Sequence, residues 1–176
     1  MSEVDGMNRF YGKYRATVVQ NIDPEFRARL MCIVPDVLGS VPSSWCEACA
    51  PLAGPTGPPM GVYMVPPIGA GVWVEFEHGD AGKPIWTGCR FSAGDVPTLA
   101  FAGLPISPSI VLQTAGQNTL VISDLPGPTG GIMLKSTTGA TLIVNDTGIY
   151  IQNGKGASIT MVGPAVNVNN GAMNII

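Results

Sequence analysis

The fold is decided by a repetitive stretch near the C-terminus, GIYIQNGKGASITMVGPAVNVNN, which occupies residues 148–170. Short runs of alternating apolar and polar residues are separated by glycines, and the interval from run to run is 7 to 9 residues. A period this short is typical of stacked strands rather than of helices. Extended in both directions, the pattern predicts strands at residues 132–136, 141–144, 149–152, 158–161, 166–169 and 173–176.

Each predicted strand carries two apolar residues at alternate positions, which point to the same face of a sheet. These inward residues are Ile132, Leu134, Leu142, Val144, Ile149, Ile151, Ile159, Met161, Val166, Val168, Met173 and Ile175. A sheet of such short strands has nothing within one chain to cover its apolar face. We therefore expect three chains to close three sheets into a prism, with these twelve residues as the trimer core.

Charged residues are distributed unevenly along the chain. Residues 1–95 hold 17 of the 21 charged side chains, and only Asp124, Lys135, Asp146 and Lys155 follow. The apolar, proline-containing segment between the two parts is typical of an ordered connector. The sequence thus predicts an N-terminal arm at 1–11, a compact domain at 12–95, a connector at 96–112 and a spike domain at 113–176.

The first part of the chain predicts a small barrel of five or six short strands. They are expected at residues 14–23, 29–35, 45–52, 62–64, 72–77 and 85–90, with a glycine- and proline-rich loop at 53–61. In the strand at 72–77, Val72, Val74 and Phe76 alternate with polar or aromatic residues, which predicts one buried and one solvated face. The predicted fold class is all-β throughout.

Composition argues against several classes of function. Hydrophobic residues make up 45% of the 176 positions, while 23 glycines and 16 prolines argue against long helices. A net charge of −3 offers little attraction for nucleic acid or for an anionic bilayer. The acidic, polar start predicts no signal peptide, and no run approaches the roughly 20 apolar residues of a spanning helix.

Two groups of residues are candidates for chemistry. Cys32, Cys46, Cys49 and Cys89 would suffice for two disulfides or a zinc site, but only Cys46 and Cys49 are closely spaced, which favours reduced thiols and no metal. The cluster of Glu75, Glu77, His78 and Asp80 is explained by the solvated face of one strand followed by a turn. We therefore predict no catalytic, cofactor-binding or metal-binding residue.

Two segments resemble a known family. Residues 67–80, PIGAGVWVEFEHGD, and their continuation KPIWTG at 83–88 are similar to the signature of the OB-fold domain in phage baseplate assembly protein V and in valine-glycine repeat spike proteins. The resemblance covers roughly residues 12–91, and the repeat after Ile132 is similar to the intertwined triple-stranded β-helix that follows this domain in the family.

The resemblance implies a function. It implies a homotrimeric, non-enzymatic central spike of a contractile tail or injection system, assembled in the cytoplasm and carried in the particle. Its OB domains would meet tail-tube hub and baseplate proteins, and its β-helix would help to pierce the target envelope with only transient membrane contact. Several similar phage spikes end in a His-x-His iron-binding tip, but the one histidine here is His78, so we predict no iron. A proline-alanine-alanine-arginine (PAAR) repeat tip protein would then cap Ala172, Met173, Asn174, Ile175 and Ile176.

Two alternatives remain open at the level of the sequence. OB folds often bind single-stranded nucleic acid, and Tyr11, Tyr14, Trp45 and Trp73 are candidates for base stacking. Seven basic against ten acidic residues in 1–95 argue against such a groove. A trimeric receptor-binding fibre is compatible with the repeat, although Tyr150 is the only aromatic residue after Phe101.

Overall fold

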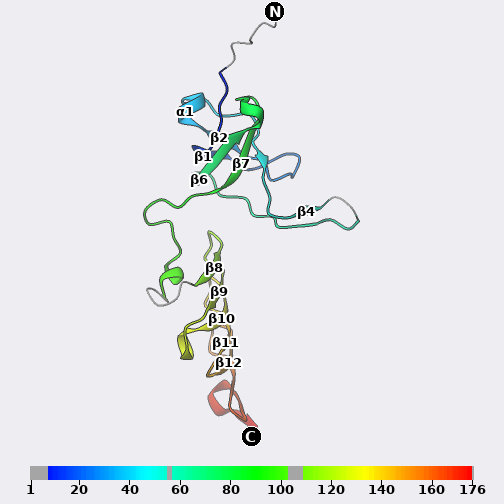
Figure 1. The fold of residues 1–176 in the computed structure, drawn as a ribbon. Coiled ribbons are helices and arrows are strands. Elements are labelled where there is room, and N and C mark those ends of the chain that lie inside the picture. The colour runs from blue at the N-terminus through cyan, green and yellow to red at the C-terminus, as the bar shows by residue number, and fades with distance from the viewer. Residues whose placement is uncertain (1–7, 55–56, 103–108, 176) are drawn as a thin grey trace, which may run out of the picture. The chain divides into compact units, whose positions relative to one another are not determined.

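The computed structural model describes residues 8–54, 57–102 and 109–175 (Figure 1). The chain divides into two compact units, the first ending at Gly94 and the second beginning at Asp95. Among the described residues, both units consist of strands with a few helices of about one turn. The predicted all-β class is therefore confirmed.

The first unit is built on a five-stranded sheet. Its strands are β1 (Tyr14–Gln20), β2 (Met31–Ile33), β3 (Glu47–Ala48), β6 (Gly71–Phe76) and β7 (Pro84–Cys89), in the order β2-β1-β6-β7-β3. β1 pairs with β2 in antiparallel fashion, at the positions where the first two strands were expected. The short helices α1 (Pro35–Leu38) and η1 (Glu77–Gly79) follow β2 and β6 respectively.

The core of this unit lies on the face of β6 that its alternation predicts. Val72 and Val74 are fully buried and Phe76 nearly so. Val18 from β1 and Cys32 from β2 belong to the same cluster of buried side chains. The ring of Phe76 packs edge-on against Tyr14, with 5.6 Å between the ring centroids. Burial of these side chains fixes the sheet from which the loops extend.

Two expected strands of the first unit are wrong in extent or place. Only β3 forms a ladder within residues 45–52, and residues 62–64 lie outside any strand. A two-stranded ribbon of β4 (Ala53–Gly54) and β5 (Met60–Gly61) occurs instead inside the segment expected to be a loop. The apolar run at 62–64 has the composition of a strand, yet its side chains are exposed rather than packed on the sheet.

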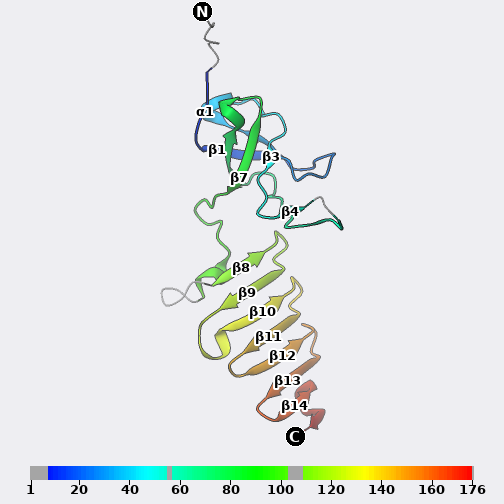
Figure 2. The same ribbon diagram turned by 45° about the vertical axis from the view of Figure 1, so that its right-hand side comes forward.

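The second unit contains one antiparallel meander of eight strands (Figure 2). They are β8 (Ile110–Gln113), β9 (Thr119–Ser123), β10 (Gly131–Lys135), β11 (Thr141–Asn145), β12 (Gly148–Gln152), β13 (Ser158–Val162), β14 (Ala165–Val168) and β15 (Met173–Ile175). Each strand pairs with the next one along the chain. The six strands predicted from the repeat correspond to β10 through β15.

The repeat pattern did not reveal β8 and β9 or the single-turn helices η2 (Thr98–Phe101), η3 (Gly127–Thr129) and η4 (Asn169–Gly171). β8 starts at Ile110, so the sheet begins inside the segment 96–112 that was expected to be a connector. β9 pairs with β10 across the turn that holds η3, which is longer than the turns of the repeat. Residues 103–108 of the connector and 1–7 of the N-terminal arm lie outside the described residues.

Candidate functional site

One face of the second sheet carries two rows of aliphatic side chains. Because the register aligns equivalent positions across all eight strands, each strand adds one residue to each row. We call the first the isoleucine row: Ile110, Ile122, Ile132, Val144, Ile149, Met161, Val166 and Ile175. We call the second the leucine row: Leu112, Leu120, Leu134, Leu142, Ile151, Ile159, Val168 and Met173.

The structure places all twelve predicted inward residues in these two rows, so they share one face of one sheet. It adds four more, Ile110, Leu112, Leu120 and Ile122, on the two strands that the sequence did not reveal. A signal was present in β9, where Leu120 and Ile122 alternate with Thr119 and Ser123. It was obscured because Val121 makes the centre of that strand apolar on both faces.

Both rows are open to solvent in a single chain. Leu134 is 48% exposed, Ile132 46% and Ile110 63%, and no residue of either row is fully buried. A soluble protein rarely leaves so many neighbouring aliphatic side chains uncovered, and such a continuous surface is typical of an interface with another protein.

The opposite face changes character along the sheet. Val111, Val121, Met133 and Ile143 oppose one another on the first four strands, and Tyr150, Thr160 and Asn167 continue the same register. Val121 is only 7% exposed. The turn after β9 is tied to the sheet where Asp146 Oδ2 accepts from the N–H of Gly127 at 3.1 Å. On this face the later strands thus place Tyr150, Thr160 and Asn167 where the first four strands place apolar residues.

Asparagine side chains fix two turns of the meander, those that follow β11 and β12. Asn145 Oδ1 accepts from the backbone N–H groups of Thr147 and Gly148 at 2.9 and 3.2 Å. Asn153 Oδ1 accepts from those of Lys155 and Ala157 at 2.8 and 3.0 Å. These bonds satisfy backbone donors that tight turns leave without a ladder partner, and they set the ends of the strands that carry the two rows.

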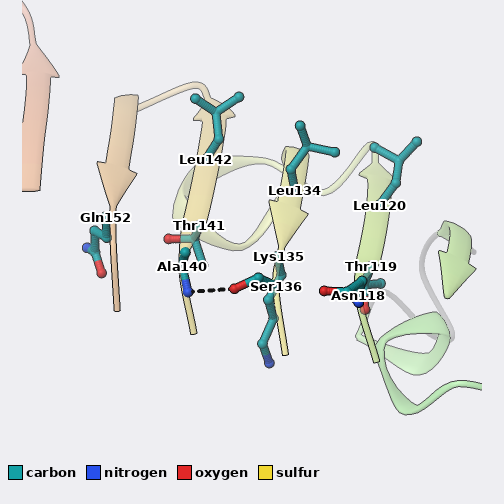
Figure 3. Close-up of a pocket in the computed structure, with 10 residues that line it drawn as sticks. All are labelled: Asn118, Thr119, Leu120, Leu134, Lys135, Ser136, Ala140, Thr141, Leu142 and Gln152. Carbon is teal, nitrogen blue, oxygen red and sulfur yellow. Dashed lines mark hydrogen bonds between the residues drawn. The ribbon is translucent and has the colours of Figure 1, made fainter. Parts of the chain in front are cut away.

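A hollow of about 510 Å³ lies beside the leucine row (Figure 3). Leu120, Leu134 and Leu142 line it from three neighbouring strands, and Figure 3 shows these side chains directed to the same side. The small residues Ser136 and Ala140 line it at the adjacent turn, where Ser136 Oγ accepts from the N–H of Ala140 at 3.0 Å. Lys135 and Gln152 are also among the lining residues, but most of the exposed lining is apolar, so an aliphatic side chain is the chemistry that the hollow suits.

The predicted tip residues lie at the end of the sheet. Met173 and Ile175 are 56% and 53% exposed on β15, and Ala172 is an exposed residue between η4 and β15. Asn174 pairs in register with Asn167 of β14. Ile176 lies outside the described residues.

The acidic cluster of the first unit lies at the end of β6 and in the turn that follows it. Glu75 forms an ion pair with Lys13, with 2.8 Å between Oε1 and Nζ. His78 is exposed in the turn after β6, where its φ is 54°, and Asp80 Oδ1 accepts from the N–H of Gly82 at 2.9 Å. These contacts are those of an exposed ion pair and a turn.

The cysteines occupy two different environments. Cys32 and Cys46 are fully buried, while Cys49 and Cys89 are exposed. The hydrogen bond to Cys46, together with burial, raises the pKa of Cys32, which stays a protonated thiol at neutral pH. In the part of the chain that the structure describes, no three residues among His, Cys, Asp and Glu gather as metal ligands.

The β4–β5 ribbon is the second exposed apolar surface. It projects from the body of the first unit, and we call residues 50–54 and 57–64 the apolar arm (Figures 1 and 2). Met60, Tyr63 and Met64 are 58%, 67% and 59% exposed. The arm lies within residues 48–74, which contain no charged side chain. Such a surface suits contact with another protein.

The two units thus define a class of protein, in which a small β-domain precedes a long antiparallel sheet whose apolar face is uncovered in a single chain. Two family models match the chain in this order: the Type VI secretion system/phage-baseplate injector OB domain at residues 14–91, and the phage baseplate V C-terminal trimerisation domain at residues 109–174. The chain belongs to the phage baseplate V family of spike and injector proteins.

The family establishes several points. The first unit is an OB domain, and the trimerisation domain supports a homotrimer. The chain is a structural component of a phage baseplate or an injection system, which suggests a non-enzymatic role. A search among curated proteins gave no match. Within the described residues, the structure contains no helix with the length and apolarity needed to traverse a bilayer.

Proposed function

We propose that this chain is the central spike of a contractile tail or injection machine, which links the tail-tube hub to the tip and helps to pierce the target envelope. The observation that carries the proposal is the pair of apolar rows along all eight strands. Three such sheets closed around an axis bury both rows in every copy and form a continuous core along the whole domain.

Stiffness supports the piercing role. In the described part of the second unit every strand pairs with its sequence neighbour, and asparagine side chains tie two of the turns between them. A fully laddered, trimeric sheet opens locally only at a high cost in free energy, which suits the transmission of an axial push. Each chain contributes one continuous sheet, so the three chains would meet between sheets rather than between alternating strands.

The domain assignment remains part of the proposal. We assign residues 1–11 to an arm, 12–95 to the OB domain, 96–112 to the connector and 113–176 to the spike, with the first strand of the spike sheet reaching back to Ile110.

The apolar arm is the element that we assign to the hub. Its exposed methionines and its tyrosine would pack on an apolar surface of a tail-tube or baseplate protein, and its lack of charge removes the cost of burying ions there. At the other end, we propose that Ala172, Met173, Asn174, Ile175 and Ile176 of the three copies meet a PAAR-repeat tip protein. Both contacts would be made during cytoplasmic assembly of the particle. The spike has no catalytic task in this proposal.

An epitope placed in the exposed turn around Lys155 tests the position of the chain. In particles of the machine that encodes it, antibody labelling seen by electron microscopy should place this epitope on the axis, at the end of the baseplate away from the tube. A second epitope at the exposed Asp36 of the OB domain should lie closer to the tube. Labels along the flanks of the particle would support a receptor-binding fibre instead, and purified particles without either label would exclude a spike.

A further inference from the structure

The two rows differ in the shape of their side chains. Seven of the eight members of the isoleucine row are β-branched, and Met161 is the exception. The leucine row begins with four leucines, which branch one carbon further from the backbone. β-branched side chains are wide near the backbone and stiff, whereas leucine reaches further out. The two halves of the apolar face therefore offer different surfaces to whatever covers them.

The hollow lies on the leucine side only. It spans the level of β9, β10 and β11, where the leucine row consists of Leu120, Leu134 and Leu142. On the same three strands the isoleucine row presents Ile122, Ile132 and Val144, which are 39%, 46% and 39% exposed. The hollow with its three leucines thus lies at the same level of the sheet as three uncovered β-branched residues. On each strand, the leucine and the β-branched residue are two positions apart.

A three-fold axis brings these two features together. In a ring of three parallel copies every contact is heterologous, which means that it joins two different surfaces of neighbouring chains. The edge of the sheet at one end of its strands therefore meets the edge at the other end of the strands in the next copy. The side of one copy that carries the leucine row consequently adjoins the side of the next copy that carries the isoleucine row.

We propose, on the basis of the trimeric spike inferred above, that the hollow of each copy takes Ile122, Ile132 and Val144 of the next copy at the same level. The site is then incomplete in one chain and complete only in the ring. Ser136 and Ala140 keep the hollow open, because a larger side chain at either position would occupy the space of the incoming residues.

A double-mutant cycle between Ala140 and Val144 tests this contact. The two residues lie near opposite ends of the strand β11, roughly 13 Å apart along one chain, which is beyond the range of direct coupling. Ala140→Leu should lower the guanidinium midpoint of trimer unfolding, because it fills the hollow that the neighbour needs. Val144→Ala in the Ala140→Leu background should recover part of that loss, with a coupling of roughly tenfold or more in the unfolding equilibrium constant.

The control cycle pairs Ala140→Leu with Met133→Ala, since Met133 lies on the other face of the sheet. These two changes should add without coupling. If Ala140→Leu gives no soluble trimer, Ala140→Val enters the same cycle as a smaller change. An Ala140→Leu trimer that is as stable as the wild type or more stable, or a Val144→Ala effect that is simply additive, would overturn the proposed contact.

Light scattering on the wild-type protein separates this inference from the spike itself. A wild-type chain that is not a trimer would remove the proposed function and the contact together. A wild-type trimer with an additive cycle would remove only the contact between the isoleucine row and the hollow.

Discussion

At the scale of single residues, the Asp23 side chain is bonded by both backbone and side-chain donors. Its carboxylate accepts from the backbone N–H groups of Glu25, Arg27 and Arg29 at 3.0, 2.8 and 3.2 Å. The guanidinium of Arg29 donates to it as well, with 2.7 Å between Nη2 and Oδ1. This clamp holds a turn in which Phe26 and Ala28 have positive φ values of 55° and 62°. The buried carboxylate of Asp23 therefore maintains a backbone conformation that is unfavourable for residues with a Cβ, such as Phe26 and Ala28.

The clamp predicts a specific dependence of stability on pH. The hydrogen bonds from Arg29, reinforced by the backbone donors, hold the pKa of Asp23 well below its ordinary value of 3.8. Because the unfolded chain then binds the proton first, the stabilisation is complete above about pH 4 and is lost as the pH falls below it. We expect the melting temperature of the OB domain to fall between pH 4 and pH 2, as followed by circular dichroism.

Asp23→Asn should lower the melting temperature at pH 7 and flatten this acid limb, since the amide carries no charge for Arg29. Asp36→Asn, at an exposed position of α1, is the matched control and should retain the wild-type slope. An unchanged acid limb in Asp23→Asn would mean that other carboxylates determine the acid sensitivity of this domain.

At the scale of the element, glycine controls how closely the strands of the meander approach. β12 begins at Gly148, where an added Cβ would overlap the carbonyl oxygen of Met161 on β13. Gly163 has a φ of 54° in the turn between β13 and β14, but an added Cβ there meets no atom within 4 Å. Gly148 thus combines a close approach with a φ of 157°, whereas Gly163 has a positive φ without a close approach.

We predict that Gly148→Ala disrupts the pairing of β12 with β13 and reduces the yield of trimer on a sizing column. Gly163→Ala should assemble normally and lose only about 1–2 kcal/mol per chain, the cost of a left-handed conformation for a residue with a Cβ. Assembly yields and guanidinium midpoints of the two variants give the comparison. Equal behaviour of both variants would show that the close approach of β13 to Gly148 does not limit assembly.

The strands differ in how far the sequence pattern predicts them. Glycine spacing and two-residue alternation suffice for β10 to β15, because each short strand pairs only with its sequence neighbour. In β9, Leu120 and Ile122 lie on one face and the buried Val121 lies on the other. Because both faces are apolar, the sequence pattern does not show which face of β9 belongs to the two rows. The hollow could not be predicted from the sequence either. Ser136 and Ala140 are ordinary small residues, and they line a hollow only because the strand register places three leucines beside them. The Asp23 clamp depends on a folded turn rather than on a spacing.

At the scale of the whole molecule, the uncovered rows require that the chain associate. The OB domain has its own buried core of side chains such as Leu30, Val34 and Val74, all fully buried. In the second unit, by contrast, the fully or nearly fully buried side chains include Thr119, Val121 and Ser123, which lie on the face opposite the two rows. The OB domain can therefore reach its native packing as a single copy, whereas the apolar face of the second unit depends on other chains.

This contrast predicts a trimer of about 55 kDa by light scattering, three times the 18.3 kDa chain mass. Leu134→Asp should abolish it, because three carboxylates would be buried in one apolar core without partners. Thr160→Asp, on the opposite face of β13, should remain trimeric. Far-ultraviolet circular dichroism of the Leu134→Asp chain should still show an OB domain that melts cooperatively, while the unfolding transition of the spike disappears. A trimeric Leu134→Asp chain would place the interface elsewhere and leave the two rows without a partner.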